Sequence, residues 1–251
     1  TLLAVSASAL QPAAPKPPTH HTTAATIPDP PPEVAPFQPS LLDEFLLGAF
    51  RWTLQQQSGG PQSDLPGFEG MVQELLEFRQ LYGLDEQERV SYQTMVALSG
   101  PVPFIYRQLF ASAEVTPAVL AWFAKHLLPF LVGEMELTQR STDDPRAGGV
   151  LVTRCRVLEG TNCKGVCAKM CKVPTQTFFQ ERWGVPLSMT PNFETGQCQL
   201  AFGTEPLPIE EDPSIPTGCL TRCPAASAME AQPPGKQAEE EAEEAKALDA
   251  C

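Results

Sequence analysis

Cysteines gather in one stretch of the chain, and their type and spacing suit a metal-holding segment. The chain has 251 residues and eight cysteines, all but one of them between residues 155 and 223. Disulfides, a metal or iron-sulfur site, and inert buried thiols are the three explanations. We favour metal, because neighbouring turns of a helix do not offer disulfide geometry and so dense a group of inert thiols is improbable. The candidate ligands are Cys155, Cys163, Cys167, Cys171, Cys198, Cys219 and Cys223.

Three of these cysteines, Cys163, Cys167 and Cys171, are spaced four residues apart. On a straight helix they share one face, but the outer two are about 12 Å apart along the axis, too far for one ion. Either Gly165 lets the segment open into a loop, or the outer thiols face different partners among the other cysteines. A multi-iron cluster tolerates wider thiolate separation than a single ion.

The remaining ligand types narrow the choice of metal. His126 is the one histidine in the region expected to fold, so two histidines are not available for a mononuclear iron site. Soft thiolate ligands favour an iron-sulfur cluster first and zinc second. Basic side chains flank the cysteines, and they either lower the thiol pKa or belong to an ordinary solvated surface. These side chains are Arg154, Arg156, Lys164, Lys169 and Lys172.

His126 itself has two interpretations. It forms a secondary polar site with Glu134 and Glu136, or it is a buried histidine of an apolar helix, which is the commoner situation.

The periodicity of the first half predicts about five helices. Ser40 and Asp43 form a capping box for the first, and Asp85 with Glu88 resembles another at the start of the third. The fourth is expected to turn Ile105, Leu109 and Phe110 inward. The fifth, Pro117 to Val132, is apolar on nearly every side, so it is a core helix or lines an apolar cavity. The expected bounds are about 41–58, 67–82, 85–99, 104–113 and 117–132, with a kink at Pro129.

The second half changes period. Residues 150–157 alternate as a strand, followed by a helical cysteine segment, a short helix from about Pro174 to Trp183 ended by Gly184, and a hairpin. The hairpin joins 185–189 to 197–202. The predicted fold class is α+β, a helical N-terminal half packed on a small cysteine-rich lobe with a few short strands.

Composition sets the domain boundaries and excludes some functions. Residues 1–39 are proline-rich and are expected to be a disordered head or targeting remnant; 40–224 form one domain with the cysteine-rich lobe at 150–224; 225–251 form a disordered acidic tail. The net charge of -13 argues against nucleic acid as a partner. The longest apolar stretch is interrupted by Lys125 and His126 and is too short for a transmembrane helix.

The run from Cys155 to Cys223 resembles a known family, most closely in TNCKGVCAKMCKVPTQ, in Met189 to Glu194, and in the closing pair Cys219 and Cys223. The similar family is the iron-containing β-carotene isomerases of plant and algal plastids, associated with strigolactone biosynthesis. The resemblance implies a chloroplast enzyme that converts all-trans-β-carotene into its 9-cis isomer with the help of iron. It also implies an apolar carotenoid substrate and leaves peripheral contact with a plastid membrane open, although the acidic charge does not favour it.

Two other classes of function compete with the isomerase. One is an iron-sulfur electron-transfer or assembly protein, which should carry an exposed cluster. The other is a zinc-binding structural module, which should form a closed four-ligand knot.

Overall fold

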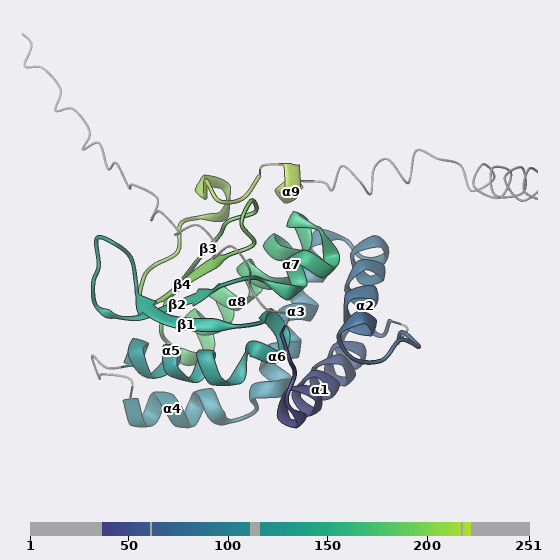
Figure 1. The fold of residues 1–251 in the computed structure, drawn as a ribbon, viewed down its shortest axis with the longest axis horizontal. Helices are drawn as coiled ribbons and strands as arrows, with labels where there is room; N and C mark the ends of the chain where they lie inside the picture. Colours follow the sequence, from purple (N-terminus) through teal and green to yellow (C-terminus); the bar gives the residue numbers. More distant parts are fainter. Residues whose placement is uncertain (1–36, 61, 111–115, 217, 222–251) are drawn as a thin grey trace, which may run out of the picture.

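The computed structural model describes residues 37–60, 62–110, 116–216 and 218–221. The predicted acidic tail, 225–251, and most of the predicted head lie outside these residues. Helices pack against one small antiparallel sheet, which confirms the α+β fold class (Figure 1). None of the described helices is long and apolar enough to cross a membrane.

Three helices build the N-terminal half. The first has the predicted capping box, because Asp43 N donates to Ser40 Oγ and Ser40 N donates to the Asp43 carboxylate. It ends at Gly59, whose φ of 65° needs the left-handed region that glycine favours. The capping box expected at Asp85 is wrong, because Gly83 is the N-cap residue of the third helix and no side chain caps it. The bounds are α1 Leu41–Ser58, α2 Gly67–Leu81 and α3 Leu84–Ser99.

The next helices differ from expectation in what they bury. In α4 (Val102–Phe110), Pro103 and Tyr106 are buried, whereas Ile105, Leu109 and Phe110 are exposed. The inward orientation predicted for these three is therefore wrong, because Tyr106 faces the core and turns its neighbours outward. The apolar stretch divides into α5 (Thr116–Leu127) and α6 (Pro129–Val132), which confirms the break at Pro129.

The four-stranded sheet is antiparallel throughout, in the order β1-β2-β4-β3. The predicted hairpin is present as β3 and β4, but the predicted strand ends at Val152 rather than continuing to Val157. There, Cys155 N donates to Gly196 O and a helix begins one residue later, so the alternating pattern beyond Val152 is not a strand. The bounds are β1 Met135–Gln139, β2 Ala147–Val152, β3 Leu187–Pro191 and β4 Cys198–Phe202.

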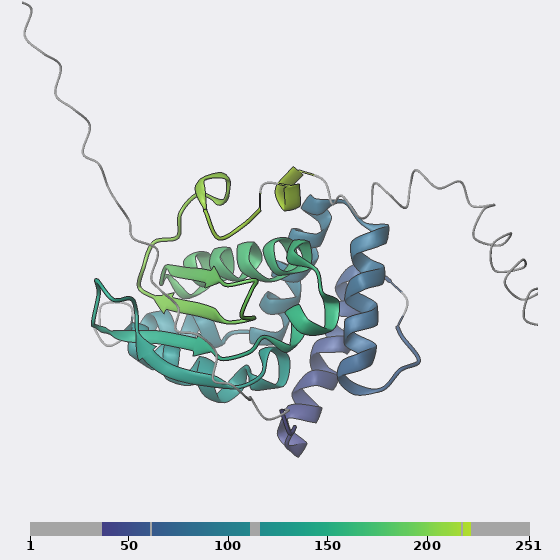
Figure 2. The same ribbon diagram turned by 45° about the horizontal axis from the view of Figure 1, so that its top comes forward.

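One long helical segment follows β2 and crosses the molecule between the N-terminal helices and the sheet (Figure 2). On one side it contacts α3, and on the other α8 contacts β3. Much of the segment is π-helix, a rare form that is frequent at functional sites. The bounds of its parts are α7 Arg156–Thr161, the π-helix η1 Val166–Lys172, α8 Val173–Phe178 and the π-helix η2 Phe179–Trp183. Two short helices follow β4, the 3-10 helix η3 Ile209–Glu211 and α9 Gly218–Thr221.

Two groups of buried side chains form the core. The sheet core joins α5 to the strands and includes Leu120, Val150 and Phe202. The helical core joins α1, α2 and α3 to the cysteine segment and includes Met71 and Val90. Cys155 packs against both, so the cysteine segment lies where the two cores meet.

Candidate metal centre

The ends of two paired strands bring the first two thiols together. Cys198 is the first residue of β4 and pairs with Val152, the last residue of β2. Cys155 follows β2 by three residues and is held by its N–H, which donates to Gly196 O at 2.8 Å. The hairpin turn before β4 therefore fixes Cys155 beside the start of the strand that carries Cys198.

The π-helix η1 supplies two more thiols, Cys167 and Cys171. A π-helix pairs residue i with residue i+5, so its turn is longer than an α-turn and residues four apart lie closer to one line along the axis. Gly165 has the α-helical φ of -66°, so the segment does not open into a loop there. Of the two outer thiols, Cys171 interacts with Cys155, as the alternative prediction expects, whereas Cys163 accepts a hydrogen bond from Arg79.

Four thiols share one buried environment: Cys155, Cys167, Cys171 and Cys198, which we call the thiol cluster. Burial, and then the charges of the other three members, raise the pKa of Cys167 well above its ordinary value. Burial, followed by Cys171 and Cys155, does the same to the pKa of Cys198. The pKa of Cys171 is raised to about 12, first by burial and then by Cys155. These mutual effects mean that the four thiols lie within electrostatic range of one another.

A buried lysine next to the thiol cluster ties three parts of the chain together. Lys172 is 1% exposed, and its ammonium group donates to Met189 O, to the Asp212 carboxylate and, at 3.1 Å, to Ser214 Oγ. Its positive charge lowers the pKa of Cys167 and Cys198, but less than burial raises it. Lys172 thus fixes η1 to β3 and to the segment around Asp212.

Two of the other three candidate ligands, Cys163 and Cys219, belong to described parts of the chain. Cys163 is buried in the helical core and accepts a hydrogen bond from Arg79 Nη1 at 3.1 Å. Cys219 belongs to α9, which contacts η1, and Cys223 lies outside the described residues. The structure therefore groups four of the seven predicted ligands.

The donor chemistry of the thiol cluster suits a thiophilic metal, because the cluster is rich in sulfur and no disulfide joins the six described cysteines. Within the described part of the chain, however, no three Cys, His, Asp or Glu side chains form a group that could hold a metal ion. Any metal held by these four thiols therefore needs Cys223, a rearrangement of the side chains, or a cluster that bridges wider sulfur separations.

Residues 130–211, which contain all four thiols, match the family model described as "Beta-carotene isomerase D27-like, C-terminal". We call these residues the D27-like domain, after their similarity to this model; they are about a third of the chain. The D27-like domain begins in α6 and ends in η3, so it includes the sheet and the helices from α7 to η2.

Two curated plant proteins resemble the chain beyond the D27-like domain. "Beta-carotene isomerase D27, chloroplastic" of Medicago truncatula is 27% identical over 172 residues, which is 68% of this chain and 68% of that protein. The protein of the same name from Arabidopsis thaliana is 31% identical over 128 residues, 51% of this chain and 48% of its own length. No solved structure matches the chain.

The basic side chains of the D27-like domain have specific partners rather than a common role. Arg154 pairs with Glu159, Lys169 pairs with Glu88, and Lys164 lies 5.2 Å from the centre of the Phe193 ring. Arg156 lies 3.9 Å from the centre of the Phe68 ring. For Lys172 the predicted effect is present, since its charge lowers the pKa of Cys167 and Cys198, but burial raises the pKa of both thiols more.

Sequence reasoning placed His126 wrongly and missed the role of Lys172. His126 is exposed on α5, where its ring lies 4.4 Å from that of Trp122 and its Nδ1 is 2.7 Å from Trp122 O. It is therefore not a core histidine. Asp212 and Ser214, the partners of Lys172, lie forty residues or more along the chain, so no local spacing could have revealed them.

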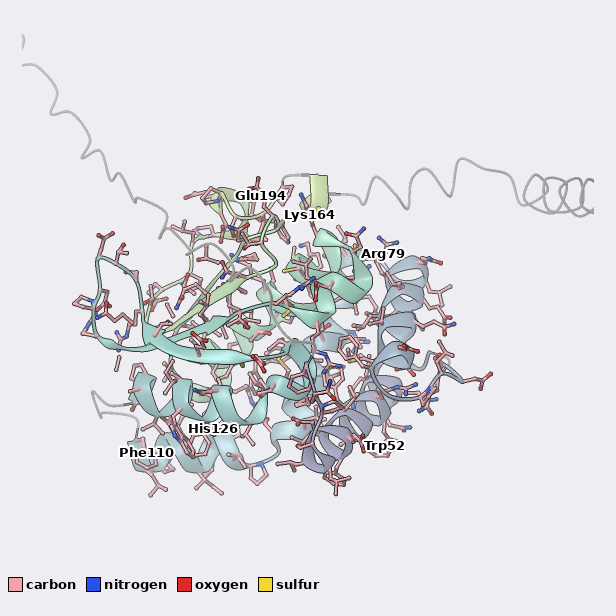
Figure 3. All side chains as sticks on the ribbon, viewed as in Figure 1. Trp52, Arg79, Phe110, His126, Lys164 and Glu194 are labelled. Carbon is pink, nitrogen blue, oxygen red and sulfur yellow. The ribbon has the colours of Figure 1, made fainter. Side chains whose placement is uncertain are left out.

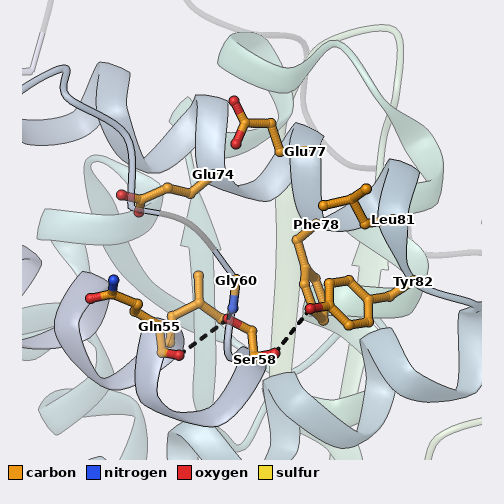
Figure 4. A pocket seen from close by; sticks show the side chains of 9 residues that line it. Gln55, Ser58, Gly60, Glu74, Glu77, Phe78, Leu81 and Tyr82 are labelled. Atoms are coloured by element: carbon orange, nitrogen blue, oxygen red, sulfur yellow. Dashed lines mark hydrogen bonds between the residues drawn. The ribbon is translucent and has the colours of Figure 1, made fainter.

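A small pocket lies between α1 and α2, outside the D27-like domain (Figure 4). Its volume is about 20 Å³, enough for one water molecule and far too little for a carotenoid. Tyr82 closes one side, with its hydroxyl donating to Ser58 O at 3.1 Å. This pocket is not a substrate site.

Proposed function

We propose that the protein isomerises a carotenoid double bond in the chloroplast, converting all-trans-β-carotene into 9-cis-β-carotene, and that the thiol cluster holds iron. One observation carries the proposal: the residues that match the D27-like model include the four thiols whose pKa values affect one another. Support for the substrate and the compartment comes from the two plant relatives, both named chloroplastic β-carotene isomerases.

Iron is the proposed metal because the donors are sulfur and because a cluster of several iron atoms accommodates more widely spaced thiolates than one ion. Cys155, Cys167, Cys171 and Cys198 would be its ligands. Iron bound there would lend and recover one electron, which transiently lowers the order of the double bond that rotates and leaves no net oxidation. Zinc is the alternative metal, and it would not support this exchange.

The protein's own residues would exclude water and fix the ligands. Cys198 is 7% exposed and lies within the sheet core beside Val152 and Leu200. Lys172 would offset part of the negative charge of thiolates next to it, since it is buried and does not move away. This burial disfavours an electron-transfer protein, whose cluster should be exposed for exchange with a partner.

The test compares two cysteine variants of the full chain. Protein purified without oxygen should contain iron and acid-labile sulfide, and incubation with all-trans-β-carotene in detergent micelles should raise the 9-cis isomer on chromatography. Cys198→Ala should lose both iron and turnover. Cys163→Ala, a substitution of an equally buried thiol outside the thiol cluster, should retain both.

Two outcomes would contradict the proposal. Colourless protein with one zinc ion and no turnover would favour the structural zinc module. Equal loss of iron in Cys163→Ala and Cys198→Ala, with both variants folded by circular dichroism, would show that the thiol cluster is not the iron site.

A further inference from the structure

Two neighbouring helices, α4 and α5, expose large apolar side chains on the outside of the molecule. Six side chains form this surface, each between 42% and 69% exposed. A soluble monomer rarely exposes so many large apolar side chains together, and such patches mark interaction sites. We call it the apolar face; its residues are Phe104, Ile105, Leu109, Trp122, Phe123 and Leu127.

The two helices present this face as one unit. Tyr106 of α4 donates its hydroxyl to Thr116 O at the start of α5, at 3.1 Å, and packs with Leu120 and Ala121 in the sheet core. Figure 1 shows α4 and α5 side by side along one edge of the molecule. In Figure 3, Phe110 and His126 lie on that edge, whereas Lys164 and Glu194 lie at the opposite one.

The helices that carry the apolar face differ in charge from the whole chain. The net charge of the chain is -13. The described residues of α4, α5 and α6 nevertheless include no Asp or Glu, and they carry Arg107 and Lys125. These described residues combine aromatic and aliphatic side chains with positive charge, which complements a surface that is apolar inside and negatively charged outside.

We propose that the apolar face docks on an anionic lipid bilayer, with Phe104, Leu109, Trp122 and Phe123 entering the region between headgroups and acyl chains. A bilayer fits better than a protein groove, because two side-by-side helices form a broad surface, and Trp122 with His126 matches the amphipathic rings of membrane interfaces. This inference deepens the proposed function, since a carotenoid dissolves in lipid. The purpose of the docking rests on the proposed function, whereas the docking itself does not.

The helix that carries half of the apolar face also packs on the core that contains the thiol cluster. The inner side of α5, through Leu120, Ala121 and Ala124, belongs to the same sheet core as Cys198, and Cys155 and Cys171 pack against that core. The apolar face and the thiol cluster are thus connected through one buried core.

The experiment is flotation of the full chain with vesicles of phosphatidylcholine mixed with phosphatidylglycerol. The unmodified protein should float with these vesicles. The double variant F104S/L109S should bind them at least about tenfold more weakly, because two apolar side chains that would be buried in lipid are lost. Leu81→Ser is the matched control: Leu81 is 66% exposed on α2, much as Leu109 is 69% exposed on α4, and this variant should float normally. Lys125→Gln should weaken binding to the mixed vesicles but not to pure phosphatidylcholine.

Equal flotation of F104S/L109S and the unmodified protein would overturn the inference. A concentration-dependent dimer of the unmodified protein that F104S/L109S abolishes, without flotation, would assign the face to a second copy instead. Turnover of β-carotene in detergent micelles by the unmodified protein tests the proposed function separately. Failure there with normal flotation would remove the isomerase and keep the membrane docking.

Discussion

Arg51 and Glu74 form a buried ion pair that no local pattern in the sequence reveals. Their side chains are both 8% exposed, and Arg51 Nη2 lies 2.6 Å from Glu74 Oε1. Arg51 also donates to Gly67 O and Ser63 O, each at 3.2 Å, and Ser63 N donates to Glu74. The pair therefore holds the connection between α1 and α2 as well as the two helices.

Removing one partner of this pair should be costly. We expect Glu74→Ala to lower the free energy of unfolding by about 3–5 kcal/mol, because the Arg51 charge is left buried and unpaired. Glu86→Ala, which removes the exposed partner of Arg89, should change it little, because solvent screens that pair. Urea denaturation of both variants measures the difference, and similar midpoints would contradict the proposed role.

Asp212 should make stability depend on pH in the acidic range. Burial raises the pKa of its carboxyl, but hydrogen bonds from Lys172 and Ser214 together outweigh burial and leave the pKa below its ordinary value. The unfolded chain then binds the proton more readily. The contribution of Asp212 is thus present above the ordinary carboxyl pKa and is lost as pH falls through the lowered pKa. Thermal melts should show a steeper acid loss for the unmodified protein than for Asp212→Asn; parallel curves would contradict this.

At the scale of elements, local signals predicted helices well where a cap or an end residue sets the boundary. Ser40 with Asp43, Gly59 and Gly184 mark helix ends as expected, because these residues satisfy backbone groups locally. The errors lie where partners are distant. Met135–Gln139 becomes a strand because β2 pairs with it, and nothing local in that segment indicates the pairing.

In the candidate site too, local signals predicted some features and distant partners decide the others. The density of cysteines predicted the segment, but the grouping of Cys155 with Cys198 depends on β2 pairing with β4, and Cys163 is buried in the helical core, where Arg79 donates to it. Spacing alone therefore could not separate the four clustered thiols from the other three candidates.

The two glycines of the long helical segment should respond oppositely to alanine. Gly184 has a φ of 70°, so Gly184→Ala should lower the free energy of unfolding by about 1–2 kcal/mol. Gly165 has helical angles and space for a methyl group, so Gly165→Ala should raise it by about 0.4–1 kcal/mol through the unfolded chain. The urea midpoint of Gly184→Ala should lie below that of the unmodified protein and the midpoint of Gly165→Ala above it. A shift of both midpoints in the same direction would contradict the prediction.

At the scale of the whole molecule, the two cores should unfold together, because Cys155 packs against both and the cysteine segment contacts helices and sheet. Met71 is fully buried in the helical core, so Met71→Ala should cost about 2–5 kcal/mol and shift one common transition. Leu41→Ala, at an 86% exposed position, should change little. Far-ultraviolet and near-ultraviolet circular dichroism should give coincident melts; separate transitions would mean that the cores are independent.

The absence of carboxylates on the described parts of α4 to α6 has a consequence for how salt acts on the molecule. At about 0.01 M salt, charges act over about 30 Å, so an anionic vesicle repels the whole acidic chain. At about 0.15 M that range shrinks to about 8 Å, and the vesicle then interacts mainly with the helices that touch it. Moderate salt should therefore increase flotation with anionic vesicles, opposite to the behaviour of a uniformly basic membrane protein. The repulsion between the acidic chain and the vesicle should also orient the molecule before contact.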